Sequence, residues 1–197
     1  MMEVMVQLIE EGHNYEFYIY GHGQLKEYII NYIELNKAHS YIYFMGELEY
    51  KNLFSVLKDA FMFIGMGTVH IEASSMGVPA LQGIDSETEQ VSYGFFSSLK
   101  GLSIGEVNEN FLKVNMKDSI LELAAKNEQE YYEFALAQIR RANIFNIDEV
   151  IKQYYNFIKN ASTVFDVKLP TFKFHIVKIL RQFYKFRVIT KIEHRNM

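Results

Sequence analysis

The sequence predicts an α/β domain with three layers, in which helices cover both faces of a mainly parallel sheet and further helices follow near the C-terminus. Apolar runs rich in β-branched and aromatic residues alternate with segments of helical periodicity between residues 1 and 81. The run over 60–64 is short and continuously apolar, which is typical of a strand buried on both faces. A hydrophobic content of 49% in 197 residues is enough for a substantial core.

The first half of the chain is predicted as a series of strand–helix units. Apolar residues at helical spacing predict helices over 1–11, over 24–37 and ending near Lys58. Runs rich in aromatic and β-branched residues predict strands over 15–20, 41–45 and 60–64. A short helix and a strand that ends at Leu81 complete this half.

The second half is predicted to begin with loops and to end with helices. Within 82–105, the acidic stretch 85–89 is expected to cap a short helix, and the aromatic run 93–96 is expected to pack in the core. Helical periodicity then predicts three helices over 117–127, 128–143 and 147–160.

A glycine turn between a strand and a helix organises the chain. Gly65 and Gly67 allow a sharp turn and a close approach of the backbone to a ligand. Thr68 is predicted to cap the helix that follows. The exposed N–H groups at the start of such a helix, together with the positive end of its dipole, form a site for phosphate.

Glu72 lies one turn further along the same predicted helix, where a carboxylate can bind the two hydroxyls of a ribose. Gly77 is predicted to end the helix, and Pro79 prevents it from continuing. The segment therefore predicts a nucleotide-diphosphate site. The alternative is an ordinary strand–turn–helix whose glycines serve only packing.

The spacing Gly-x-Gly-Thr-x-x-x-Glu-Ala-x-x-x-Gly-x-Pro resembles the donor-nucleotide segment of glycosyltransferases with the GT-B fold, particularly the family-4-like group. The resemblance covers 1–159, as the C-terminal half of such an enzyme, and implies a Rossmann-like domain. It also implies that Gly65, Met66, Gly67 and Thr68 line the diphosphate and that Glu72 binds the ribose.

Two further glycine-containing loops fit the same resemblance. Gly21 and Gly23 follow an early strand, as a similar glycine pair does in the family. The loop that starts at Gly46 resembles the one that touches the nucleotide base, which implies base contacts for Gly46 and Leu48. Both loops also fit tight strand-to-helix turns that bind no ligand.

The sequence departs from the family pattern in two respects. The loop that carries an Arg and a Lys for the donor diphosphate, and the N-terminal acceptor domain, do not occur in it, because its first residues already match the helix that follows that loop. The acid that many members place eight residues before Glu72 is replaced by Ile64. We therefore expect half of a two-domain site that is inactive alone, with its catalytic residues unassigned.

Composition limits the chemistry that the chain can carry. There is no Cys, and the six His residues show no metal-ligand spacing, so we expect no metal and no cofactor beyond a nucleotide-diphosphate sugar as substrate. The N-terminus shows no signal peptide, and the absence of Cys fits a reducing cytoplasm. We therefore expect a cytoplasmic protein.

Charge divides the chain at about residue 165. The segment 166–197 carries a net charge of +6, whereas 1–165 carries −10. We expect Pro170 to precede a final helix whose apolar face lies opposite Lys178, Arg181 and Lys185. This pattern predicts either peripheral binding to an anionic membrane surface on the inner leaflet, or packing of the apolar face on the domain or on a missing half. An acidic body argues against nucleic acid as a partner.

These observations predict a donor-binding domain over 1–165 and a basic amphipathic tail over 166–197. The predicted function is the donor-binding half of a glycosyltransferase that uses a nucleotide-diphosphate sugar in surface polysaccharide biosynthesis. The predicted partners are that donor and an acceptor domain, or a separate chain that supplies it. The alternatives are a non-catalytic interaction or scaffold module with the same fold, and half of a nucleotide-sugar epimerase.

Overall fold

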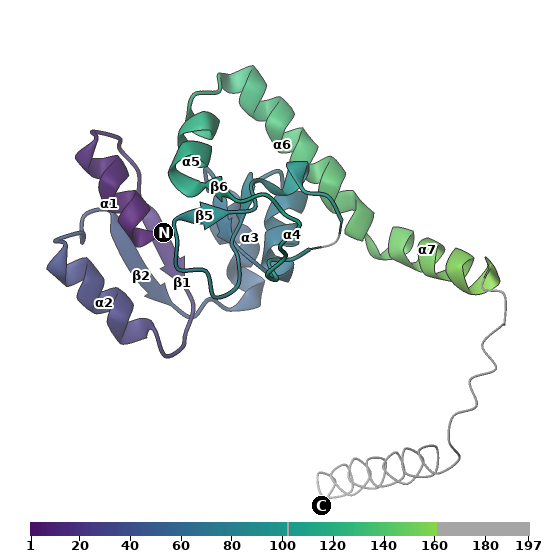
Figure 1. Ribbon diagram of the computed structural model, residues 1–197, viewed down its shortest axis with the longest axis horizontal. Coiled ribbons are helices and arrows are strands. Elements are labelled where there is room, and N and C mark those ends of the chain that lie inside the picture. The colour runs from purple at the N-terminus through teal and green to yellow at the C-terminus, as the bar shows by residue number, and fades with distance from the viewer. Residues whose placement is uncertain (102, 161–197) are drawn as a thin grey trace, which may run out of the picture. The chain divides into compact units, whose positions relative to one another are not determined.

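The computed structural model describes residues 1–101 and 103–160, and the chain divides into two units. The first unit is Met1–Gln153 and contains every element from α1 to η3 (Figure 1). The second unit begins at Tyr154, inside the helix α7 (Ile147–Asn160). The tail residues Lys178, Arg181 and Lys185, and the predicted boundary at residue 165, lie outside the described residues.

Two parallel strands joined by a helix follow the first helix of the chain. Their elements are α1 (Met2–Glu10), β1 (Phe17–Tyr20), α2 (Lys26–Leu35) and β2 (Ile42–Gly46). Phe17 pairs with Ile42 at the start of the ladder, and a bulge separates Ile19 from Tyr20 near its end. A helical crossover is required here because a short turn cannot return the chain to a parallel start.

A second parallel pair repeats this arrangement and contains the glycine turn. Its elements are η1 (Tyr50–Asn52), α3 (Leu53–Leu57), β3 (Phe63–Gly65), α4 (Thr68–Ser75) and β4 (Ala80–Gln82). Phe63 pairs with Ala80, and Gly65 pairs with Gln82. Gly77 follows α4 with a φ of +81°, so the predicted helix stop is confirmed.

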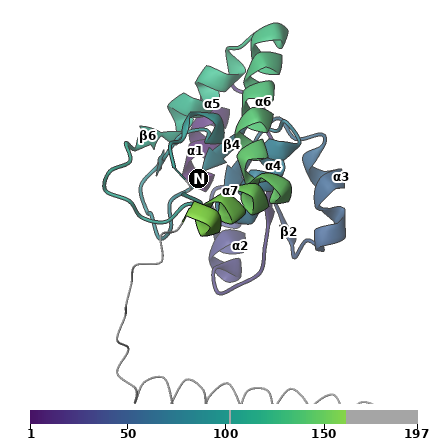
Figure 2. The same ribbon diagram turned by 90° about the vertical axis from the view of Figure 1, so that its right-hand side faces the viewer.

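The remaining elements cover these strands. They are β5 (Val91–Ser92), η2 (Phe96–Ser98), β6 (Val114–Asn115), α5 (Met116–Ala124), α6 (Glu128–Ala142) and η3 (Asn143–Phe145). The strands β5 and β6 pair antiparallel. Asn127 and Glu130 form a capping box that fixes the start of α6. Figure 2 shows α6 running beside α4, and a Cβ added to Gly77 would lie 3.3 Å from Ile139 of α6.

Two hydrophobic clusters hold the first unit together. One joins α1 to both parallel pairs and to α5, and its buried residues include Val4, Leu8, Ile42, Leu81, Ile120 and Leu123. The other packs α3, α4 and β4 against Phe96 and the end of α6. The two parallel pairs share no hydrogen-bonded ladder within the described residues, so side chains of the first cluster connect them instead.

The predicted fold class is confirmed: helices alternate with parallel strands, and three helices stand where three were predicted near the C-terminus. Tyr93, Phe95 and Phe96 are buried, as expected of core residues. The short helix expected at 85–89 is wrong. Residues 85–86 form a turn, and the Glu87 carboxylate accepts the N–H groups of Thr88 and Glu89 and pairs with Lys113, which holds the segment as a loop.

Candidate functional site

The glycine turn connects β3 to α4 through Met66 and Gly67. Gly67 is the N-cap residue of α4, with a φ of 77° that glycine adopts without strain. The prediction that Thr68 caps the helix is wrong: Thr68 is the first helical residue, and no side chain caps α4. The cap position needs a positive φ, which a β-branched threonine adopts only with strain.

The first turn of α4 has the properties of an anion site. Its leading N–H groups have no acceptor within the helix, and the positive end of the helix dipole lies at the same place. Thr68 is exposed, and Met66 beside it is 42% exposed. Backbone N–H groups at an accessible helix start can bind phosphate oxygens.

Packing favours glycine at position 65. A Cβ added at this position would lie 2.6 Å from the ring of Phe63, two residues earlier in β3. The Gly65 carbonyl also accepts the N–H of Gly83 at 2.8 Å, which ties the end of β3 to the residue after β4. The packing alternative therefore accounts for Gly65, whereas the backbone conformation of Gly67 is what makes the turn.

A second loop, 103–106, lies directly on the glycine turn. The N–H of Gly67 donates to the carbonyl of Ile104 at 2.7 Å, and a Cβ added to Gly105 would lie 2.6 Å from Cβ of Met66. The Glu106 carboxylate bonds to its own backbone N–H, to the N–H of Ile104 and to the hydroxyl of Ser103, and these bonds, in that order, keep its pKa below the usual value. Sequence reasoning missed this loop, for which the spaced glycines Gly101 and Gly105 were the available signal.

Glu72 is held by a residue from another loop. The hydroxyl of Tyr50, at the start of η1, donates to Oε1 of Glu72 at 2.9 Å, and this bond raises the pKa of Tyr50. The second carboxylate oxygen, Oε2, is inaccessible to solvent and has no partner among the described residues. A polar atom left in this state costs about 1–3 kcal/mol. Glu72 therefore has one oxygen bonded to Tyr50 and one oxygen that is buried without a partner among the described residues.

The loop after β2 lies at the same end of the structure as the loop after β1. The N–H of Gly21 donates to the carbonyl of Gly46 at 2.7 Å, and Gly46 itself has a φ of 74°. Leu48, which lies between Gly46 and Tyr50 in the sequence, is half-buried. The bond from Tyr50 to Glu72 therefore brings the Gly46–Leu48 loop to α4, although no bond joins Gly46 or Leu48 to the glycine turn within the described residues.

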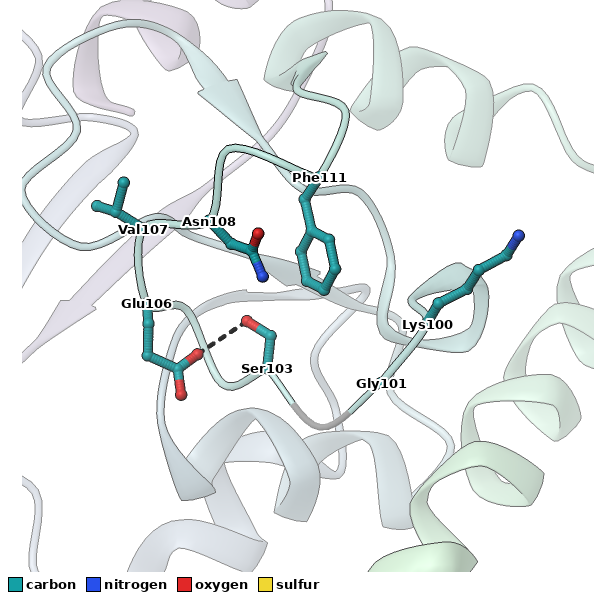
Figure 3. A pocket seen from close by; sticks show the side chains of 7 residues that line it. All are labelled: Lys100, Gly101, Ser103, Glu106, Val107, Asn108 and Phe111. Carbon is teal, nitrogen blue, oxygen red and sulfur yellow. Dashed lines mark hydrogen bonds between the residues drawn. The ribbon is translucent and has the colours of Figure 1, made fainter.

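A cavity of about 500 Å³ is lined in part by residues of the loop 103–106. Its lining residues are Lys100, Gly101, Ser103, Glu106, Val107, Asn108 and Phe111. Figure 3 shows the Phe111 ring and the Asn108 amide facing the space beside Ser103, whereas the amine end of Lys100 points away. No residue of the glycine turn is among the lining residues, and the loop 103–106 contacts the turn through Ile104.

No cluster of three His, Asp or Glu residues in 1–101 and 103–160 is placed to hold a metal ion. No helix within the same ranges is long and apolar enough to cross a membrane.

In open α/β sheets, ligands bind at the carboxyl ends of parallel strands, where this chain places the glycine turn and the carboxylate of Glu72. Comparison with known proteins gives the following similarities. No family model matches the chain. Over 174 residues the chain is 26% identical to the UDP-N-acetylglucosamine–peptide N-acetylglucosaminyltransferase GtfA subunit of Streptococcus agalactiae, covering 85% of this chain and 30% of the relative.

A solved structure has a similar fold. A TarM mutant from S. aureus, in complex with fondaparinux, alpha-GlcNAc-glycerol and UDP, matches 79% of this chain and 32% of its own with a TM-score of 0.52 and 19% identity. The resemblance to GT-B glycosyltransferases is thereby confirmed over most of the chain. The chain spans about a third of the length of these two relatives.

Proposed function

We propose that this chain is the donor-binding part of a glycosyltransferase and that its donor is a UDP-sugar. The similarity to GtfA, which is named for UDP-N-acetylglucosamine, and to TarM, whose structure contains UDP, supports UDP as the nucleotide. The donor domain in this proposal is 1–165, and the acceptor class is the growing surface polysaccharide that the sequence suggested.

The observation that carries the proposal is the pairing of a helix start with the carboxylate of Glu72, one oxygen of which lacks a partner among the described residues. The diphosphate would lie on the first turn of α4, against Gly65, Met66, Gly67 and Thr68. Glu72 lies one turn further along α4, where its carboxylate would accept a ribose hydroxyl, and Oε2, which is covered in this structure, would first have to be uncovered. The base would lie along the loop of Gly46 and Leu48, which Tyr50 links to Glu72.

The lack of positively charged side chains at the glycine turn indicates that this part of the site binds a nucleotide weakly. The segment 65–72 contains no Lys or Arg, so only backbone dipoles would oppose the charge of the diphosphate. Cations for the leaving diphosphate would have to come from outside this segment, and we propose that an acceptor domain or another chain supplies them. For that reason we propose that the chain alone binds nucleotide without transferring sugar.

The helix α7 supports the need for a partner. Among the described residues nothing covers its apolar side chains, which are all more than 40% exposed, namely Ile147, Val150, Ile151, Tyr154, Tyr155, Phe157 and Ile158. At 100° per residue they occupy one side of the helix, opposite charged and amide side chains. An exposed apolar stripe of this kind marks an interaction surface. We assign it to the acceptor half of the enzyme.

Calorimetry with UDP tests the proposal. Wild type should bind UDP, and Glu72→Ala should lower the affinity by about tenfold or more, because a hydrogen bond to a charged group is lost. Glu34→Ala is the matched control, since Glu34 is an exposed glutamate near the end of α2. Equal affinity of wild type and Glu72→Ala would refute the ribose role, and no binding of UDP would favour the scaffold alternative.

A further inference from the structure

Tyr50 and Glu72 meet at the candidate site although 22 positions separate them in the sequence. The Tyr50 side chain is 75% exposed, so water could satisfy its hydroxyl, yet the hydroxyl donates to Oε1 of Glu72 at 2.9 Å. Oε2 of the same carboxylate is inaccessible to solvent and has no partner among the described residues. Glu72 therefore has one oxygen engaged by the protein and one that lacks a donor.

A tyrosine hydroxyl and a ribose hydroxyl offer a carboxylate the same O–H donor. We propose that Tyr50 is a gate of the nucleotide site: in the nucleotide-free protein its hydroxyl holds the position on Oε1 that a ribose hydroxyl takes when the nucleotide binds. This inference rests on the proposed function and names the residue that the nucleotide must displace.

The position of Tyr50 suits such a gate. It begins η1, two residues after Leu48, and its ring is largely in solvent. The ring can therefore turn away without leaving a cavity, so that the lost hydrogen bond is the main cost of opening. Because one O–H···O bond replaces another at Oε1, the nucleotide gains net bonding only at Oε2.

The first test removes the hydroxyl and keeps the ring. Tyr50→Phe should bind UDP about two- to tenfold more tightly than wild type, since the competing bond is gone. Tyr18→Phe is the matched control, because the Tyr18 hydroxyl also donates to a glutamate, Glu16, at 2.6 Å on an exposed surface. Its affinity should equal that of wild type. A weaker or unchanged affinity of Tyr50→Phe would overturn the gate.

The Glu72→Ala background separates the gate from the proposed function. There the additional change Tyr50→Phe should not alter the affinity, because the competing bond no longer exists. Suppose that UDP binds wild type, that Glu72→Ala weakens this binding and that Tyr50→Phe leaves it unchanged. The gate proposal is then wrong, whereas the proposed nucleotide site is supported. If UDP binds none of the proteins, both proposals fail.

The second test follows the ring itself. The chain contains no Trp, so Tyr50→Trp introduces one fluorophore at the gate. UDP at a concentration that calorimetry shows to be saturating should shift its emission, because the ring leaves Glu72 and enters a different environment. Tyr18→Trp serves as the control and should not respond. Identical Tyr50→Trp spectra with and without saturating UDP would contradict the gate.

Discussion

The Nε2 atom of His70 lies 3.3 Å from the carbonyl oxygen of Ala80, so a buried side chain ties the helix after the glycine turn to β4. The ring meets Phe96 edge-on, with centroids 4.7 Å apart, and Nδ1 has no partner among the described residues. A neutral ring with its proton on Nε2 satisfies Ala80. Protonation would add a charge and a second N–H in this apolar environment, and burial lowers the pKa of His70 to about 4.

This burial predicts that the protein loses stability on acidification. The pKa of His70 is about 4 in the folded chain and 6.5 in the unfolded chain, so the unfolded chain binds more protons between these values. The free energy of unfolding should therefore fall as the pH decreases from 6.5 to 4, by at most about 3 kcal/mol from this residue.

Urea denaturation at a series of pH values measures this effect. His70→Gln removes the ionisable group, so the difference in unfolding free energy between wild type and variant should shrink as the pH approaches 4. Parallel curves for the two proteins over this range would show that His70 is not the cause.

Gly105 should be sensitive to a single added methyl group. Its φ is +118°, and a Cβ would lie 2.6 Å from Cβ of Met66 and 3.1 Å from the carbonyl oxygen of Gly83. Gly105→Ala should therefore lower the free energy of unfolding by about 2–4 kcal/mol, which combines backbone strain with overpacking. It should also weaken UDP binding, because Met66 belongs to the glycine turn.

Gly101→Ala is the control for this experiment, since Gly101 has a φ of +79° but open space around its Cβ position. It should lose only about 1 kcal/mol from the backbone strain. Equal losses in thermal or urea unfolding would mean that the contact between the loop 103–106 and the turn is not tight.

The purified chain should transfer no sugar from a UDP-sugar, and UDP release should stay at the level of background hydrolysis. The physical reason is that the glycine turn has no cationic side chain of its own to neutralise the leaving diphosphate. Turnover that wild type shows and Glu72→Ala loses would contradict this prediction.

The basic tail is predicted to bind anionic membranes. Each Lys or Arg near an anionic leaflet contributes about 1 kcal/mol, so Lys178, Arg181 and Lys185 together can hold a peripheral protein. The chain should sediment with anionic vesicles, less so as the salt concentration rises, and not with neutral vesicles. A chain cut after Val167 should stay in solution, and equal sedimentation of both chains would support packing of the tail on protein instead.

Much of the fold could be predicted from local patterns. The periodicity of α1, α5 and α6 and the apolar runs of β1 to β4 appear in the sequence because each of these elements buries one face or stripe. The errors were local as well. The acidic run 85–89 is compatible with a helix start, and only its bonds to Lys113 and to its own backbone hold it as a turn.

The sequence by itself determined the parallel strand–helix units and the glycine turn before Glu72, because propensity, spacing and the permissive φ of glycine act over a few residues. Tertiary structure alone decided what meets that turn: the loop 103–106 on Gly67, and Tyr50 on Glu72. These contacts join residues 22 or more positions apart. The two hydrophobic clusters position the helices and strands, and these positions decide which distant loops come into contact. No local sequence pattern encodes these long-range contacts.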